Sequence, residues 1–364
     1  MDKIKAFLAR KGVICSFRQY GVDALGAMAQ GLFCTLLVGT ILYTLGQQLH
    51  IGFLTAPVVS VGTVSYTVGG LASAMVGPGI AVAIGTALHC PPLVLFSLIP
   101  VGFAANAMGG AGGPLAVYAV TIIAAELGKL VSKETRIDIL VTPCVTVLSG
   151  IAVAQLIAAP IGSAARAVGL AIMWATELQP FFMGVLVSAL IGIALTLPIS
   201  SAAICAAFGL TGLAGGAAVA GCCAQMVGFA VMSFKENRWG GLVAQGVGNS
   251  MLQMPNILKN PRIWIPPTLA SMITGPLATC VFKLQMNGSP VSSGMGTCGF
   301  VGQIGVYTGW VSDIAAGTKA AITPMDWIGL VLICFILPAV LSTLFCRVLE
   351  KRGWIREGDM KLDL

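Results

Sequence analysis

The chain has 364 residues, of which 57% are hydrophobic and only 9% are charged, and its formal net charge is +7. Ordinary globular proteins carry about 25% charged residues. This composition excludes a typical soluble domain and predicts an all-α integral membrane protein.

Long stretches of the chain carry no charge. They lie between Asp23 and Glu126, Asp138 and Arg166, Glu177 and Lys235, Arg262 and Lys283, and Asp326 and Arg347. Because a spanning helix needs about 20 apolar residues, these windows can hold roughly ten crossings. The expected spans are near 24–48, 52–76, 79–105 (with a break at Pro91-Pro92), 111–131, 137–160, 181–199, 201–232, 240–258, 263–282 and 327–347. Residues 161–180 are expected to form an interfacial helix, and residues 284–326 a long Gly/Ser-rich stretch.

Both ends of the chain are basic. Residues 1–20 place five cations beside apolar residues at helical spacing, which predicts either an amphipathic segment on an anionic inner leaflet or a solvated tail. The apolar core of a signal peptide is missing there. Near the other end, the cations are Arg347, Lys351, Arg352, Arg356 and Lys361. By the positive-inside tendency we expect both termini in the cytoplasm, with residues 21–348 in the membrane and 349–364 as a cytoplasmic tail.

A short charged motif occurs twice. Residues 133–139 read KETRIDI and residues 259–265 read KNPRIWI, with Lys, Arg, Ile and Ile in the same register. We interpret this as an internal duplication, with halves near 50–160 and 180–285. Secondary carriers are commonly built this way, with the substrate site near the membrane midplane at the repeat interface. At both junctions Lys and Arg can reach phosphate head groups.

Polar residues inside apolar runs must find a partner in the protein or line a wet cavity. Amides and carboxylates suit neutral polyols, which are held by paired hydrogen bonds. The candidate substrate-binding residues are His89, Asn106, Glu126, Gln225, Asn249, Gln253, Asn256 and Gln303. Structural roles remain open for each: amides also join neighbouring helices, Glu126 can pair with Lys129, and His89 can be a packed imidazole.

Two glycine-rich segments predict re-entrant hairpins. Gly294, Gly296 and Gly299 match the dinucleotide fingerprint, but no strand precedes them, so a buried or water-facing hairpin is the better interpretation. Residues 106–113 are its expected counterpart. Asp313 and Asp326 are expected at the solvent edge.

The sequence carries no motif for intrinsic catalysis. Walker, GxSxG and HExxH patterns are missing, and the cysteines show no zinc-ligand spacing. We therefore expect no catalytic residue, no metal and no cofactor. Nucleic-acid binding is unsupported because the basic residues are spread along the chain.

Residues 109–143, 220–271 and 288–305 resemble the IIC-type membrane protein family of the phosphotransferase system that includes the perfringolysin O regulator-like proteins. The resemblance implies a permease domain of about ten spans that binds a sugar-like solute, forms a homodimer and works with cytoplasmic IIB and IIA proteins, of which IIB phosphorylates the sugar. Residues 139–144, ILVTPC, lack a glutamate resembling the G-I-T-E-P signature, so no catalytic residue is carried over.

The expected function is therefore translocation of a small polar solute, most simply a sugar, across a bacterial inner membrane by alternating access. Any phosphotransfer would be done with a separate IIB partner. Two alternatives remain open from the sequence. One is an ion- or proton-coupled carrier of another metabolite, with Glu126 as the coupling group; the other is a membrane solute sensor or regulator.

Overall fold

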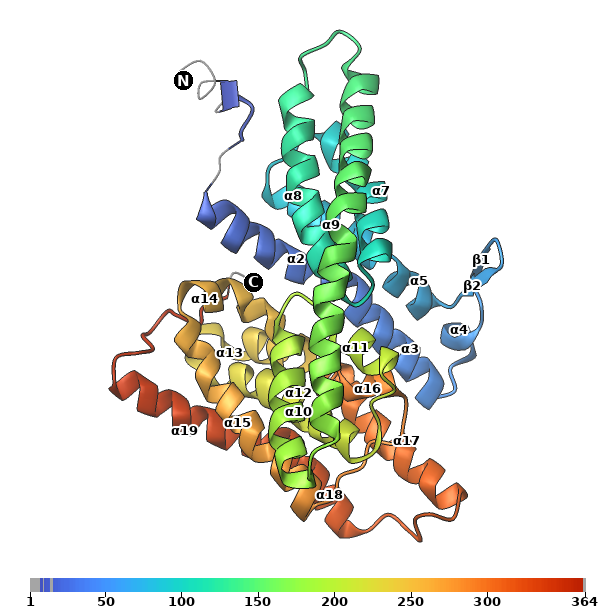
Figure 1. Cartoon of the computed structure of the whole chain (residues 1–364), viewed down its shortest axis with the longest axis vertical. Coiled ribbons are helices and arrows are strands. Elements are labelled where there is room, and N and C mark those ends of the chain that lie inside the picture. The colour runs from blue at the N-terminus through green and yellow to red at the C-terminus, as the bar shows by residue number, and fades with distance from the viewer. Residues whose placement is uncertain (1–6, 9, 14–15, 363–364) are drawn as a thin grey trace. The chain divides into compact units, whose positions relative to one another are not determined.

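The computed structural model describes residues 7–8, 10–13 and 16–362, and these are predominantly helical (Figure 1). Residues 1–6, 9 and 14–15 of the predicted N-terminal segment lie outside this description. Five helices in the described part are long and apolar enough to cross a membrane, or six when the bent pair Val68–Ala74 and Val76–Ala87 is included as one span. The predicted helical membrane-protein class is confirmed, while length and composition identify fewer spans than the ten expected.

The chain divides into two compact units, Met1–Ala164 and Ala165–Leu364. Unit 1 begins with a continuous helical run, Arg18–Gln48, in which one π-helical segment precedes α2 and a second separates α2 from α3. Its elements are η1 (Arg18–Ala24), α2 (Leu25–Leu32), η2 (Phe33–Leu37), α3 (Val38–Gln48), α4 (Gly52–Thr55), β1 (Val59–Val61), β2 (Val64–Tyr66), α5 (Val68–Ala74), α6 (Val76–Ala87), α7 (Pro92–Gly109), η3 (Gly110–Gly112), α8 (Gly113–Val131) and the first part of α9 (Asp138–Thr176).

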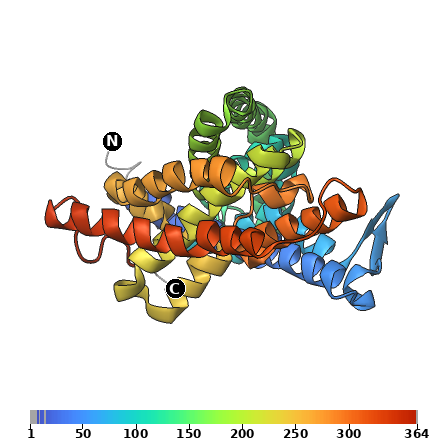
Figure 2. The same ribbon diagram turned by 90° about the horizontal axis from the view of Figure 1, so that it is seen from below.

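The predicted span at 52–76 is wrong. This stretch folds into α4, an antiparallel β1–β2 hairpin and α5, and the hairpin projects away from the other helices in both views (Figure 1, Figure 2). Val59, Ser60 and Val61 alternate apolar and polar residues, which favours a strand, and Gly62 supplies the left-handed turn. A hydropathy sum over residues 52–76 does not reveal that alternation, so the stretch was predicted as a span.

The helices of unit 1 pack through glycines. A Cβ atom on Gly77 of α6 would lie 2.3 Å from the Gly102 carbonyl oxygen of α7, so these two backbones touch. The expected break at Pro91-Pro92 separates α6 from α7, and Pro92 begins α7. Helices α7 and α8 then pack against each other after a turn at Gly110, whose φ is +52°.

Helix α9 corrects two boundaries. The expected span at 137–160 and the expected interfacial helix at 161–180 form one 39-residue helix that continues through Pro143 and Pro160. Gly162 lies against the Gly109 carbonyl, beside the α7–α8 turn. The helix starts at the other end of unit 1, near the last turn of α8.

Unit 2 is organised around α12 (Gly212–Met232), which is almost entirely buried by α10, α15 and α19. Figure 2 shows this unit from below, in green-yellow to red. Its elements are α10 (Pro180–Thr196), α11 (Ser201–Ala207), α12, α13 (Phe234–Val243), η4 (Ala244–Gly248), η5 (Ser250–Gln253), α14 (Met254–Lys259), η6 (Pro261–Trp264), α15 (Ile265–Pro276), η7 (Leu277–Val281), α16 (Pro290–Ser293), η8 (Cys298–Phe300), α17 (Val301–Ala315), α18 (Pro324–Val331), η9 (Leu332–Ile336) and α19 (Leu337–Lys351).

Helix α12 separates two different environments. At its first residue, Gly212 exchanges two backbone hydrogen bonds of 3.0 Å with Met286. Just beyond its last residue, the Ser233 hydroxyl accepts a 2.8 Å hydrogen bond from Gln245. Because the helix has 21 residues, these ends lie about 31 Å apart, which matches the hydrocarbon thickness of a bilayer.

Two short helices, α11 and α16, carry related sequences that the sequence analysis did not pair. Residues 198–201 read PISS and residues 290–293 read PVSS. Their second serines make reciprocal bonds: Ser201 Oγ donates to the Gly294 carbonyl at 2.7 Å, and Ser293 Oγ donates to the Leu210 carbonyl at 2.6 Å. Residues 106–113, expected as the counterpart of the 294–299 segment, instead form the end of α7 and its turn into α8.

Candidate solute-binding cavity

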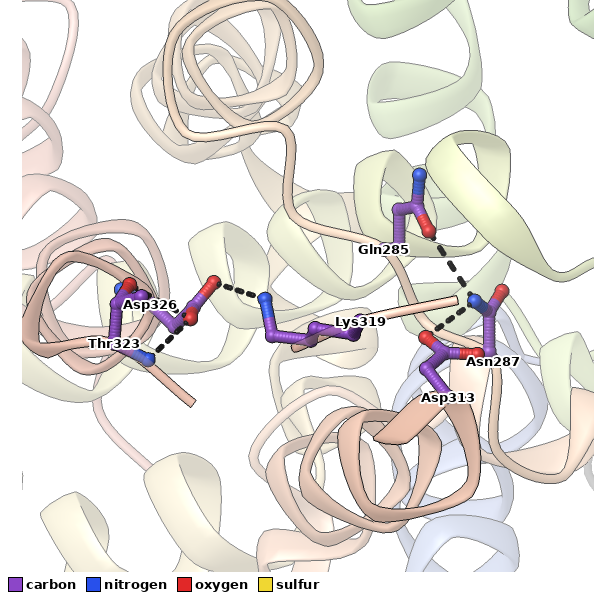
Figure 3. A network of polar contacts seen from close by, with 6 residues as sticks. All are labelled: Gln285, Asn287, Asp313, Lys319, Thr323 and Asp326. Carbon is purple, nitrogen blue, oxygen red and sulfur yellow. Dashed lines mark hydrogen bonds and ion pairs between the residues drawn. The ribbon is translucent and has the colours of Figure 1, made fainter. Parts of the chain in front are cut away.

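A polar cavity of about 470 Å³ lies in unit 2, at the end of α12 where Gly212 pairs with Met286. Three stretches build it: the segment after η7, the last turns of α17, and the α17–α18 loop with the start of α18. Its lining residues are Phe282, Lys283, Gln285, Asn287, Trp310, Asp313, Thr318, Lys319 and Asp326. Figure 3 shows most of the polar ones.

Asn287 is at the centre of one half of the polar network (Figure 3). Its Nδ2 donates to Asp313 Oδ2 at 2.8 Å and to Gln285 Oε1 at 3.2 Å. The Asp313 carbonyl accepts bonds from the backbone N–H groups of Thr318 and Lys319, which ends α17 in a tight turn. The amide and the carboxylate are thereby held side by side on the cavity wall.

The other half is an ion pair. Lys319 Nζ lies 2.9 Å from Asp326 Oδ1, and the second Asp326 oxygen accepts from the Thr323 backbone N–H at 2.7 Å. Thr323 Oγ1 in turn accepts from the Asp326 N–H, which completes a capping box at the start of α18. This reciprocal cap fixes the carboxylate at the N-terminus of the helix, where the helix dipole favours negative charge.

Aromatic side chains pack behind the polar network. The Trp310 ring, 3% exposed, packs edge-on against Trp327, with the ring centroids 5.5 Å apart. Lys319 Nζ lies 5.9 Å from the centre of the Trp310 ring. These rings form the apolar backing of a wall whose hydrogen-bonding groups are amides and carboxylates, the mixture typical of sites for small polar compounds.

The formal charges in the lining cancel. Lys283 and Lys319 balance Asp313 and Asp326, so the cavity has no net charge to attract a small ion. Its free hydrogen-bonding capacity is mixed, because amides offer both donors and acceptors. The arrangement therefore suits a neutral, hydroxyl-rich solute.

The sequence-predicted residues of unit 2 lie elsewhere. Gln225 is fully buried, and its Oε1 accepts from Trp264 Nε1 at 3.0 Å while its Nε2 donates to Thr268 at 3.2 Å. Asn249 caps η5 by accepting from the Met251 N–H. Gln303 is 8% exposed and donates to Cys223 Sγ, but its Oε1 has no hydrogen-bond partner among the described residues.

Gln253 and Asn256 bind the C-terminal segment of the chain. Gln253 Nε2 donates to the Met360 carbonyl at 2.9 Å, and Asn256 Nδ2 donates to the Lys361 carbonyl at 2.8 Å. The two amides are also joined to each other at 2.9 Å. They lie beyond the opposite end of α12 from the cavity, because Gln245 links Gln253 to Ser233.

The predicted residues of unit 1 also have defined surroundings. Glu126 Oε1 lies 2.9 Å from Lys129 Nζ, as one interpretation of the sequence proposed, although neither carboxylate oxygen accepts a well-aligned hydrogen bond from any residue that the structure describes. Asn106 packs where α6, α7 and α8 meet, beside Gly77 and Gly113. His89 is exposed and ends α6 in a left-handed conformation with φ of +53°.

The cavity residues were not singled out by the sequence analysis, which placed Asp313 and Asp326 at the solvent edge. A signal was present. In the Gly/Ser-rich stretch 284–326 the only charged residues are Asp313, Lys319 and Asp326, one cation between two carboxylates, and all three follow Trp310.

Comparison with known proteins identifies the family. The sequence profile described as phosphotransferase system, EIIC matches residues 22–362, which is nearly the whole chain. No match was found among curated proteins, and none among solved structures. The chain therefore belongs to the EIIC family, the membrane permease components of phosphotransferase systems.

Proposed function

We propose that the protein binds a small neutral solute, a sugar, in the cavity of unit 2 and carries it across a bacterial inner membrane by alternating access. The observation that carries this proposal is that the charges lining the cavity cancel, while the amide–carboxylate pair of Asn287 and Asp313 lies on its wall near Trp310. Phosphorylation of the solute is assigned to separate IIB and IIA proteins of the cytoplasm, since the chain has no catalytic motif of its own.

The proposed orientation follows from the C-terminus. The C-terminal segment is bound at the end of unit 2 that lies opposite the cavity. With the basic C-terminus in the cytoplasm, as the positive-inside tendency favours, the cavity opens toward the outer side. A solute would then meet the cavity before it crosses the membrane, as uptake requires.

The two charged motifs support the same orientation. In the first, Glu134 binds Arg10 and Lys11 of the N-terminal segment. In the second, Asn260 donates to the Trp354 carbonyl, and Arg262 lies over the Trp354 ring. Each motif thus anchors the nearby end of the chain, so cytoplasmic termini would bring both basic motifs to the cytoplasmic side.

We further propose ten crossings, in two repeats with re-entrant hairpins, and a homodimer. Helix α10 has 17 residues and no charged side chain, with Ser188 and Thr196 as its only hydroxyl-bearing residues. Helices α7 and α8 are each long enough to cross separately, with 18 and 19 residues. The short helices α11 and α16, with their reciprocal serine bonds, are suited to be the re-entrant segments.

The sequence-predicted amides remain candidates for later steps of transport. Gln303 lies on the same helix as Asp313, ten residues earlier, so the two are about 15 Å apart along the axis. Its Oε1, which has no hydrogen-bond partner among the described residues, could accept a hydrogen bond from a hydroxyl of a solute that has moved from the cavity toward the midplane. Gln225, which bonds to Thr268 and Trp264, lies on α12, farther along that helix from its cavity end at Gly212.

The test is uptake into proteoliposomes across a panel of radiolabelled sugars, with and without cytosolic phosphotransfer proteins. Saturable uptake or counterflow of one sugar class is expected. Asp313→Asn should raise KM about tenfold by weakening a charge-assisted bond to the solute, while the exposed Asp23→Asn serves as the matched control. Absence of saturable uptake under every condition would overturn the proposal.

A second candidate function is proton-coupled transport, favoured by one observation. The Glu126 carboxylate is mostly buried, and within the described part of the chain it pairs with Lys129 alone and accepts no aligned hydrogen bond. Uptake driven by an imposed pH gradient and lost in Glu126→Gln would identify this mechanism. Uptake that requires phosphotransfer proteins and does not depend on the pH gradient would exclude proton coupling.

A further inference from the structure

A second polar pocket, of about 450 Å³, lies in unit 1 at the end where α8 finishes. The N-terminal segment, the α6–α7 connection and the first charged motif meet there. Its lining residues are Arg10, Lys11, Pro91, Lys129, Ser132, Lys133 and Glu134. Four cations against one carboxylate make this lining strongly basic.

Lys129 builds the pocket rather than offering a free charge. Its side chain is 2% exposed, and its Nζ donates to the Gly12 carbonyl at 3.0 Å and to the Leu88 carbonyl at 3.2 Å while pairing with Glu126 at 2.9 Å. Two hydrogen bonds and one ion pair therefore hold the ammonium group in place. They also hold the N-terminal segment beside the end of α6.

Arg10, Lys11 and Lys133 supply the available positive charge. Arg10 and Lys11 converge on one oxygen of Glu134, at 3.0 and 2.5 Å, and Lys11 also donates to the Ser132 carbonyl. The backbone N–H of Lys133 donates to Asp138 Oδ1 at 2.7 Å. Its ammonium group makes no hydrogen bond or ion pair within the described part of the chain. The Glu134 carboxylate therefore occupies the place that an external anion would take.

A buried hydroxyl in the lining lacks a partner. Ser132 is 4% exposed, and its Oγ makes no hydrogen bond to any described residue. Buried hydroxyls are normally satisfied, and each exception calls for an explanation such as a missing ligand. An anion seated in the pocket would accept a hydrogen bond from this Oγ.

We propose that this pocket binds a phosphate group, held by Arg10, Lys11, Lys133 and the Ser132 hydroxyl, with the Glu134 carboxylate displaced. A phosphate has the oxygen acceptors that a guanidinium, two ammonium groups and a hydroxyl can share. The group belongs either to an anionic lipid at the membrane edge or to a soluble phosphate compound. The proposal is independent of the solute cavity in unit 2.

The experiment measures phosphate binding to the full chain in two arms. The first titrates inorganic phosphate by calorimetry into protein in zwitterionic nanodiscs. The second measures phosphatidylglycerol retained by protein purified from mixed vesicles, by native mass spectrometry. Glu134→Gln should tighten binding about tenfold by removing the competing carboxylate, and the Arg10→Gln/Lys133→Gln variant should weaken it about tenfold or more. Exposed Lys351→Gln is the charge-matched control and should leave binding unchanged.

Ser132→Ala separates a binding role from a folding role, because it leaves every ion pair of the pocket in place. It should weaken binding several-fold without shifting the thermal midpoint. Saturable binding in the first arm identifies a soluble phosphate compound, and stoichiometric retention in the second alone identifies a lipid; either supports the proposal. No binding in both arms, or equal binding by wild type, Ser132→Ala and Arg10→Gln/Lys133→Gln, would overturn it.

Discussion

The Asn237 side chain pairs with the C-terminal segment at Met360 as a neighbouring strand would. Its Nδ2 donates to the Met360 carbonyl at 2.8 Å, and its Oδ1 accepts from the Leu362 N–H at 2.8 Å. Glu236 adds two acceptors, for the Gly358 and Met360 N–H groups. Met360 itself is 2% exposed, so the segment is recognised through its backbone and held by one buried side chain.

Removing this amide should loosen the C-terminal segment. Asn237→Ala loses two hydrogen bonds, and the Met360 carbonyl keeps only the bond from Gln253. We expect a cost of about 1–3 kcal/mol. The thermal midpoint in detergent should fall, and proteases should cleave after Lys351 faster. The exposed amide Gln47 gives the matched control, Gln47→Ala. Unchanged protease sensitivity of Asn237→Ala would contradict the pairing.

This segment also shows what sequence reasoning cannot reach. Gln253 and Asn256 were singled out because buried amides need partners, and that requirement holds. Their partners, however, are the carbonyls of Met360 and Lys361, about a hundred residues later in the chain. A polar residue in an apolar run indicates that a partner exists, but only the fold decides whether the partner is a solute or the chain itself.

Gly221 tests the packing of α12. A Cβ atom there would lie 1.9 Å from the Ser188 carbonyl oxygen, so the helices must separate to accept it. Gly221→Ala should destabilise the protein by about 1–3 kcal/mol, measured as a lower thermal midpoint. Gly240→Ala is the control, because nothing lies within 4 Å of its added Cβ, and alanine also favours the helix. Equal midpoints for the two variants would refute this packing.

His89 should be replaceable by glycine with a gain in stability. Both histidines, His50 and His89, follow the last turn of a helix with φ of +51° and +53°. Glycine adopts this conformation freely, so each substitution should stabilise by about 1 kcal/mol. Melting curves of His50→Gly and His89→Gly check this. If solute binding falls only in His89→Gly, the imidazole has the binding role that the sequence suggested.

Acid should release the N-terminal segment. A hydrogen bond from Lys11, with the charges of Lys11 and Arg10, lowers the pKa of Glu134 below its ordinary value of 4.5. Because the folded-state pKa is the lower one, the contact stabilises the docked segment above about pH 4.5 and is lost as pH falls through the folded-state value. Protease cleavage near Arg10 should therefore rise at acid pH. Glu134→Gln should lose this pH dependence because the titrating group is gone, and a wild type that stays protected in acid would contradict the linkage.

Part of the fold was accessible from the sequence for simple physical reasons. Charge-free windows identify membrane helices, and Pro91-Pro92 does separate α6 from α7, because two adjacent prolines remove two N–H donors and Pro92 fits the first turn of α7. Helix α17 was missed within the Gly/Ser-rich stretch, since Gly302, Gly305 and Gly309 lower its helical signal while allowing close backbone approach. The cavity was missed because its wall joins three separate segments, and only tertiary packing brings Asn287 to Asp313.

The central claim, that a solute enters unit 2 from the outer side through the cavity, is tested most directly by labelling position 287. In a background with Cys15 and the thiols exposed in the described part of the chain, Cys34, Cys144 and Cys280, changed to alanine, Asn287→Cys should react with a membrane-impermeant maleimide added outside right-side-out vesicles. The transported sugar should protect it, as followed by peptide mass mapping. Labelling only from the cytoplasmic side, or labelling that no transported solute slows, would contradict the account.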